Sequence, residues 1–429
     1  MGIGGLFTPL LVLASLVGAS SALSSDAEAA VITRRQMASS PEGWEYKPAI
    51  KEGKIPNRRL RDAYTALQAW KKAMSSDPYG VTENWVGPNV CDYKGVFCEQ
   101  ALDNPCQTVV AGIDLNHADI SGYIPAEFGL LADLALLHLN SNRFRGFIPG
   151  TFTNLRLLHE LDISNNRFAG PFPAVLEKLP GLKYLDVRFN DFEGELPCSL
   201  FHKDLDALFL NNNKFTKIPD NFGESPVSVV VLAHNNIEGH IPRSTGNMSR
   251  TLNEIIFSHN KMSGAIPGEI GRLKELRVLD ISSNSFMGNL PKSMRDLRSL
   301  EHFDISGNKL KGTIPSGICN LPKLKHFAFG HNSFHDTSEH CGPSEQKSDA
   351  SRVSGKCSAE SCQRAPRKIH HERPITVATT YPPAPAPAPT PTPSPPQTDY
   401  LRTSLWRGMA PRRTCQSLFL FVRFRCAQN

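Results

Sequence analysis

The chain has 429 residues and a formal net charge of +6. Residues 109–341 carry 23 basic against 25 acidic residues, whereas residues 345–429 carry 13 against 5. Nucleic-acid binding requires a basic stripe on the folded part of a protein, so this distribution argues against a nucleic-acid partner.

The N-terminal residues predict a secretory signal peptide. Leu6 to Val17 is an apolar stretch, and small residues follow it up to Ala22, where a signal peptidase would cleave. A membrane anchor is the alternative, but about a dozen apolar residues cannot span a bilayer that needs about 20. We therefore predict a secreted, extracellular protein without a membrane span, in which residues 1–22 are the signal peptide and residues 23–56 a flexible pro-region.

Residues 57–108 predict an N-terminal capping region built on a helix. Asn57 can cap a helix that runs to about Met74, because apolar residues recur there at steps of three or four. These residues are Leu60, Tyr64, Leu67, Trp70 and Met74. The apolar stripe favours a helix packed on the following domain, and a helix lying on a membrane surface is the alternative.

The motif Asn-x-apolar-x-Gly-x-apolar-Pro recurs about every 24 residues from Ile113 to Phe334, a period typical of leucine-rich repeats. Clear copies begin at Asn142, Asn166, Asn260 and Asn308. For residues 109–341 we therefore predict an α/β solenoid, a right-handed superhelix of about ten coils. Such a solenoid presents a long concave surface, so binding is its default function.

Each coil is expected to contribute one short strand to the inner wall. In the segment Leu161–Ser164, the two outer apolar residues point into the core and the residue between them points to solvent. The Asn of the motif turns the chain, and its amide can satisfy backbone groups left unpaired by the turn. Nine coils carry it, at Asn142, Asn166, Asn190, Asn213, Asn235, Asn260, Asn284, Asn308 and Asn332, and the first coil has Ala118 instead.

The repeats are least regular in the middle of the domain. Asn190, Asn213, Asn235 and Asn260 follow one another at steps of 23, 22 and 25 residues. Irregular coils distort a solenoid locally, so the middle of the concave face is a candidate docking point.

Ten cysteines suit an extracellular protein, where disulfides persist. A solenoid exposes its core at both ends, and capping elements must cover it. Because Cys91 and Cys98 precede the first coil and Cys319 and Cys341 flank the last, we predict the disulfides Cys91–Cys98 and Cys319–Cys341. Metal binding is the alternative, but no His lies at zinc-finger spacing from these pairs, and we expect neither a metal nor another cofactor.

The C-terminal part is expected to lie outside the solenoid. Residues 342–373 form a polar hinge with two cysteines, and residues 374–400 are rich in Pro, which predicts a disordered segment of polyproline II character. Residues 401–429 are atypical, and we attribute them to a gene-model artefact. Within the coils, Asn247 and Ser249 form one N-glycosylation sequon.

This order of parts resembles the plant leucine-rich repeat extensins, including the pollen-type members, which are cell-wall proteins. Trp85–Cys98 is similar to the N-terminal cap of that family, and Thr108–Gly122 to its first coil. Leu137–Phe144 and Ser225–Val229 belong to the same pattern. The likeness covers about residues 57–341.

The resemblance implies a secreted glycoprotein, rich in hydroxyproline, that the extensin-like segment anchors to cell-wall polysaccharide or pectin. It also implies that the repeat domain binds small basic Cys-rich peptides of the rapid alkalinization factor type, as a homodimer, and links wall structure to growth and morphogenesis. Several cysteines differ from the family pattern, so its cross-links, including a covalent dimer, do not carry over. The differing positions are Arg145, His240 and Ala265, where members often have Cys, and the additional Cys106 and Cys198.

The strand positions expected to face solvent suggest where a ligand binds. They are Asp114, His138, Asp162, Asp186, Phe209, Val231, Ile256, Asp280, Asp304 and Ala328. Carboxylates on both sides of an apolar patch would suit a basic peptide, since charges steer and apolar contacts anchor. The alternative is that the aspartates are structural or simply solvated. The predicted ligand-binding residues are Tyr184, Asp186, Arg188, Phe209, Val231, Glu254, Ile256, Asp280 and Asp304.

Two other functions compete with peptide binding. A secreted inhibitor of microbial polygalacturonase would share the coil type, but such inhibitors lack the Pro-rich tail and the segment Ser225–Ser228. In a purely structural wall glycoprotein, the coils would only space the tail. An enzyme is not expected and no catalytic residue is assigned, because the histidines stand singly and no nucleophile elbow occurs.

Overall fold

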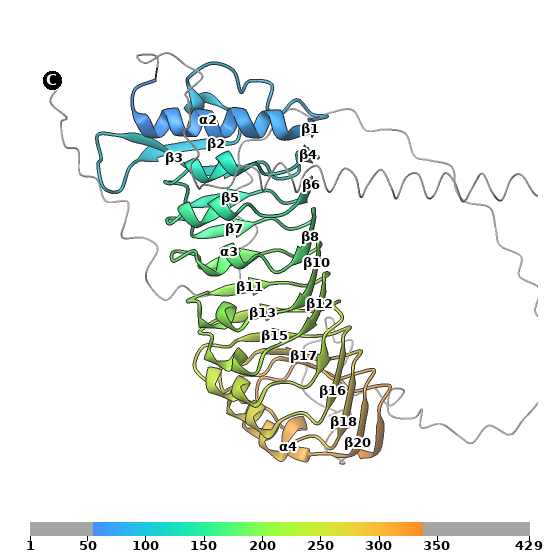
Figure 1. Cartoon of the computed structure of the whole chain (residues 1–429). Helices are drawn as coiled ribbons and strands as arrows, with labels where there is room; N and C mark the ends of the chain where they lie inside the picture. The colour runs from blue at the N-terminus through green and yellow to red at the C-terminus, as the bar shows by residue number, and fades with distance from the viewer. Residues whose placement is uncertain (1–54, 338–429) are drawn as a thin grey trace, which may run out of the picture. The chain divides into compact units, whose positions relative to one another are not determined.

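The computed structural model describes residues 55–337, which form a leucine-rich repeat solenoid with a helical N-terminal cap (Figure 1). The predicted signal peptide, hinge, Pro-rich segment and atypical tail lie outside these residues, as does Cys341.

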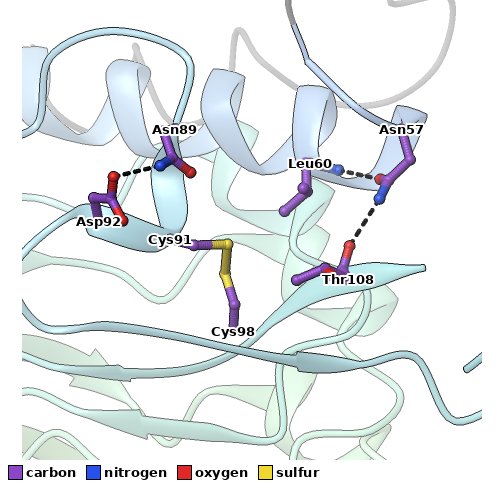
Figure 2. The surroundings of a disulfide bond; sticks show 7 residues. All are labelled: Asn57, Leu60, Asn89, Cys91, Asp92, Cys98 and Thr108. Carbon is purple, nitrogen blue, oxygen red and sulfur yellow. Dashed lines mark hydrogen bonds between the residues drawn. A yellow bond between two sulfur atoms is a disulfide. The ribbon is translucent and has the colours of Figure 1, made fainter. Parts of the chain in front are cut away.

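The N-terminal cap is built on α2 (Arg58–Ala73), as predicted. Asn57 is its N-cap, and the Asn57 side chain accepts a hydrogen bond of 2.9 Å from the backbone N–H of Leu60. The Asn57 amide also donates to the backbone carbonyl of Thr108 at 2.9 Å, which ties the helix to the first coil (Figure 2). The apolar stripe packs against the core, although Tyr64 and Met74 are only half-buried, and the Trp70 ring lies 4.9 Å from the ring of Phe128 in that coil. The packed helix is therefore confirmed, and no apolar face is left for a membrane surface.

The predicted disulfide Cys91–Cys98 is present and joins η1 (Val90–Asp92) to β2 (Val96–Gln100) (Figure 2). Its Cα atoms are 5.6 Å apart. Cys319 is also disulfide-bonded, but its predicted partner Cys341 lies outside the described residues. Cys106 is disulfide-bonded as well, and Cys198 is free and exposed.

One eleven-stranded sheet, called here the long sheet, is the predicted inner wall. Its first two strands, β2 (Val96–Gln100) and β3 (Thr108–Asp114), are antiparallel, and every later neighbour is parallel. The other strands are β5 (Leu136–His138), β7 (Glu160–Asp162), β9 (Tyr184–Asp186), β11 (Ala207–Phe209), β13 (Val229–Val231), β15 (Glu254–Ile256), β17 (Val278–Asp280), β19 (His302–Asp304) and β21 (His326–Ala328). From β3 onward each strand belongs to one coil, so the described residues contain the ten predicted coils.

Shorter strands form a second wall, which is divided into a six-stranded and a five-stranded sheet. The first sheet holds β1 (Met74–Ser76), β4 (Ser121–Gly122), β6 (Arg143–Gly146), β8 (Arg167–Pro171), β10 (Asp191–Glu195) and β12 (Lys214–Lys217). The second holds β14 (Glu238–Gly239), β16 (Lys261–Gly264), β18 (Ser285–Gly288), β20 (Lys309–Ile314) and β22 (Ser333–Thr337). The division falls between β12 and β14, which follow Asn213 and Asn235, two motif asparagines only 22 residues apart. The irregular coils therefore interrupt this wall, while the long sheet stays continuous.

Short helices complete the coils. Each begins directly after the Pro of the motif, whose fixed φ suits the extended residue before a helix. They are η2 (Ala126–Leu130), η3 (Gly150–Asn154), α3 (Ala174–Glu177), η4 (Cys198–His202), η5 (Asp220–Glu224), η6 (Arg243–Met248), η7 (Gly268–Arg272), η8 (Lys292–Asp296) and α4 (Ser316–Cys319).

The nine asparagines of the motif bond neighbouring coils together. The Asn166 side chain accepts from the backbone N–H of Phe144 at 2.9 Å and donates to the carbonyls of Leu139 at 2.8 Å and Ile163 at 3.2 Å. The same pattern occurs at Asn142, Asn190, Asn213, Asn235, Asn260, Asn284, Asn308 and Asn332. The predicted role of the amide is confirmed, and each amide also reaches the preceding coil.

Candidate functional site

The ladder of ten strand positions named above is aligned on the long sheet. Each member lies opposite the next one in parallel register, from Asp114 on β3 to Ala328 on β21. The predicted side chains therefore form one row, in which acidic residues lie on both sides of Phe209, Val231 and Ile256.

Four of the five ladder aspartates are half-buried and hold the backbone at the end of their strand. Oδ1 of Asp162 accepts from the backbone N–H of Ser164 at 2.9 Å and from its hydroxyl at 2.5 Å. Asp280 and Asp304 make the same pair of bonds to the serine two residues later, and Asp114 accepts from the backbone N–H of Asn116. One carboxylate oxygen of each of these four aspartates therefore has a structural role, which was the alternative to ligand binding.

Asp186 corrects the prediction that all ladder aspartates face solvent, because its side chain is wholly buried. Oδ2 of Asp186 lies 2.9 Å from Nε of Arg188. The Arg188 guanidinium lies 5.4 Å from the centre of the Phe209 ring, and the Tyr184 ring lies 5.5 Å from the same ring. Strand alternation places Asp186 on the face of the long sheet that is directed away from the core, but these three bulky neighbours cover it. We call the four residues the Asp186 cluster.

Burial changes the ionisation of the Asp186 cluster. It raises the pKa of Asp186 to about 7, and the nearby charge of Asp162 adds to the rise, while Arg188 acts in the opposite direction. Burial and the charge of Asp186 also raise the pKa of Tyr184. A carboxyl that titrates near neutral pH therefore lies under the middle of the candidate surface.

An ionic pair lies beside the cluster on β5 and β7. Nε2 of His138 lies 3.4 Å from Oε2 of Glu160. Burial lowers the pKa of His138, but the hydrogen bond to Glu160 and the charges of Asp114 and Asp162 outweigh it and raise that pKa. The same hydrogen bond lowers the pKa of Glu160. This end of the row is therefore acidic, and Glu160 favours the protonated form of His138.

The apolar patch occupies the next three strands. Phe209, Val231 and Ile256 lie side by side in register, and each is only half-buried. Glu254 lies on the same strand as Ile256, opposite Val278 on β17. Val278 is half-buried and extends the surface, although the sequence analysis did not select it.

Three further residues of the long sheet were missed. Phe97 on β2 lies opposite Gly112 and is 51% exposed, so the antiparallel hairpin adds an aromatic side chain to the sheet. His302 and His326 lie opposite each other, with ring centres 6.1 Å apart, beside Asp304. The strand alternation of residues 96–100 is the signal that could have revealed Phe97, but that segment was assigned to the cap.

The predicted glycosylation site lies away from the long sheet. Asn247 belongs to η6 and is exposed, so its sequon is accessible on the helical side of the coil. Among residues 55–337, no group of three or more His, Cys, Asp or Glu side chains is placed to hold a metal ion. Within the same range, no helix is long and apolar enough to cross a membrane.

Comparison with protein families agrees with this architecture. Residues 61–99 match the leucine rich repeat N-terminal domain. Residues 113–192, 275–297 and 299–321 match leucine rich repeats.

Curated relatives from Arabidopsis thaliana share the repeat domain. Leucine-rich repeat extensin-like protein 6 is 66% identical over 230 residues, which are 53% of this chain and 49% of the relative. Pollen-specific leucine-rich repeat extensin-like protein 3 is 66% identical over 194 residues, 44% of this chain and 27% of the relative. The chain thus spans about half or less of the length of these relatives.

Solved structures of plant receptor ectodomains share the fold. The HAESA ectodomain from Arabidopsis in complex with an extended IDA peptide hormone is 28% identical, with a TM-score of 0.57, over 64% of this chain and 46% of that one. The GASSHO1/SCHENGEN3 ectodomain from Arabidopsis thaliana in complex with CASPARIAN STRIP INTEGRITY FACTOR 2 is 25% identical, with a TM-score of 0.56, over 63% and 36%. The repeat domain of this chain is therefore similar to that of the leucine-rich repeat extensin-like proteins of plants.

Proposed function

We propose that this protein is a secreted, non-catalytic peptide-binding module of the plant cell wall. Its long sheet would take a small basic Cys-rich peptide of the rapid alkalinization factor type and so link the state of the wall to cell growth and morphogenesis. The HAESA ectodomain described above holds a peptide hormone ligand, which supports a peptide as the class of ligand.

One observation carries the proposal. The row on the long sheet places the half-exposed Phe209, Val231 and Ile256 between acidic groups on both sides. Apolar side chains at the centre of an interface supply most of the binding energy, whereas surrounding charges steer the partner and select it. A small folded peptide with a basic surface and some apolar side chains fits this distribution.

The wall attachment is part of the same proposal. The extensin-like names of the relatives support a tether through residues 374–400 to wall polysaccharide or pectin. We further propose N-glycosylation at the exposed Asn247, pairing of Cys319 with Cys341, and a homodimer.

A pull-down tests the proposal. Secreted residues 23–345 would be exposed to a panel of basic Cys-rich plant peptides and to fungal polygalacturonases. We expect a subset of the peptides to be retained and the enzymes to be lost in washing. Retention of the enzymes alone would establish the inhibitor alternative, and retention of neither would favour a purely structural wall protein.

A further inference from the structure

The Asp186 cluster already contains a cation of its own. Arg188 places its Nε 2.9 Å from the buried carboxylate of Asp186 and its guanidinium over the ring of Phe209. These are the two interactions that an acidic and aromatic site offers to a cationic ligand group, an ion pair and a cation–π contact.

In the cluster, Asp186, Tyr184 and Phe209 are fixed in position, and we call them the cradle. The Arg188 side chain, which lies against them, is less fixed. Asp186 is wholly buried, and its Oδ1 accepts from the backbone N–H of Arg188 at 3.1 Å. Tyr184 and Phe209 belong to hydrogen-bonded strands in the interior of the long sheet. Arg188 follows the end of β9, and its side chain is 39% exposed. The guanidinium can therefore swing into water while the carboxylate and the two rings stay in place.

The neighbouring strands determine what would replace it. On β7, Asp162 lies in register beside Asp186, and Glu160 is paired with His138 of β5. On the other side, β11 contributes Phe209 to the row and no charge. An ionised buried carboxylate that loses the guanidinium beside it is destabilised, and a second positive group in the place of Arg188 would restore the ion pair.

We propose that, in the free protein, Arg188 occupies the subsite for a cationic side chain of the ligand, and that a ligand guanidinium or ammonium displaces it from Asp186 and Phe209. The inference rests on the proposed function for the basic peptide, but it assigns the subsite that takes a basic side chain. It also makes Arg188 a competitor of the ligand. If Arg188 occupies the cradle most of the time, the ligand can bind only to the fraction of molecules in which the cradle is free. The apparent affinity for the ligand is reduced by that fraction.

The test uses the full-length chain and two small probes, the blocked tripeptides Gly-Arg-Gly and Gly-Gln-Gly, with affinity followed by NMR titration. In the Arg188→Gln variant we expect about tenfold tighter binding of the arginine probe than in the wild type, as for a cradle that is about one-tenth free. The glutamine probe should not respond. Arg167→Gln, on the second wall, is the matched control and should behave as the wild type. Adding Asp186→Asn to Arg188→Gln should abolish the gain.

Weaker or unchanged binding of the arginine probe to Arg188→Gln would overturn the inference, because Arg188 would then be a ligand contact or a purely structural residue. If that variant does not fold, Arg188→Lys keeps the charge but loses the planar guanidinium. Its affinity should then exceed that of the wild type, and an equal or lower affinity would contradict us. The tripeptides report on the cradle whether or not any signalling peptide binds, so this result is separate from that of the pull-down.

Discussion

At the scale of the residue, Asp186 shows how a repeat position changes character without leaving its register. It aligns with Asp162 on the preceding coil, yet one carboxylate is half-buried and the other is wholly buried. The difference arises from the side chains around it, since Tyr184, Arg188 and Phe209 have no counterparts of that size around the other ladder aspartates.

The raised pKa of Asp186 predicts that folding stability depends on pH. Its folded pKa of about 7 lies above the unfolded value, so between about pH 4 and 7 the folded state keeps a proton that the unfolded state has lost. The free energy of unfolding should therefore fall as pH rises through this window, by up to about 1.4 kcal/mol per pH unit from this group, and level off above it. Urea denaturation from pH 5 to 8 should show a weaker dependence in Asp186→Asn. Asp280→Asn is the control, and equal slopes in all three proteins would refute this origin.

The motif asparagines predict a large loss of stability on truncation. Asn166→Ala removes an amide that bonds Phe144, Leu139 and Ile163 in the interior of two coils, and leaves these backbone groups without a partner. We expect a loss of about 3 kcal/mol in the free energy of unfolding, measured by urea denaturation. Asn154→Ala, at an exposed position of the preceding coil, should cost less than about 0.5 kcal/mol. Equal effects of the two changes would show that the inter-coil bonds contribute little.

At the scale of the element, the cap helix and the first coil form one structural unit. Trp70 packs on the rings of Phe128 and Phe144, and the disulfide Cys91–Cys98 fixes η1 to β2. The open end of the solenoid core is thereby covered, as a terminal element of a repeat protein must do.

The double role of Asn57 predicts that this unit is sensitive to a single change. Asn57→Ala removes the helix cap, worth about 1 kcal/mol, and the bond to Thr108, worth about 1 kcal/mol more. Hydrogen exchange of the α2 amides should therefore accelerate in the variant. Arg58→Ala removes only an exposed ion pair with Asp62 and should leave exchange nearly unchanged. Equal protection in the Asn57 variant and the wild type would contradict the expectation.

At the scale of the whole molecule, the long sheet is a single surface assembled from segments that lie far apart in the chain. Its central patch comes from three successive coils, and each supplies one apolar side chain to the row. A ligand that contacts the patch must therefore span several coils, and the continuity of the long sheet across the irregular region keeps those coils aligned.

The patch predicts a loss of peptide binding without loss of folding. Val231→Lys combined with Ile256→Lys places charges on half-exposed positions, where a long side chain can reach water. Affinity for a basic Cys-rich peptide should fall about tenfold or more by calorimetry, because apolar anchors are lost and like charges are added. Met287→Lys, at a 49% exposed position on the second wall, should bind as the wild type. Unchanged affinity of the double variant would remove the patch from the site.

Much of the architecture follows from the spacing of residues alone. A nearly constant repeat places each motif asparagine next to the one of the preceding coil, and it aligns the ladder from Asp114 to Ala328. The number of coils, the N-cap of α2 and the pair Cys91–Cys98 follow from the same local patterns. Local spacing suffices here because each coil contacts only its neighbours, so a position in one repeat determines the position in the next.

Only the tertiary structure decided which members of these rows are reachable. It buried Asp186, engaged Oδ1 of the other ladder aspartates, and divided the second wall between β12 and β14. It also placed Phe189, a bulky residue just before a motif asparagine, in the left-handed region with a φ of 53° and its ring exposed. The physical reason is that coverage depends on the sizes of side chains that adjacent coils bring together, and the period specifies which residues become neighbours but not how closely they fill the space between them.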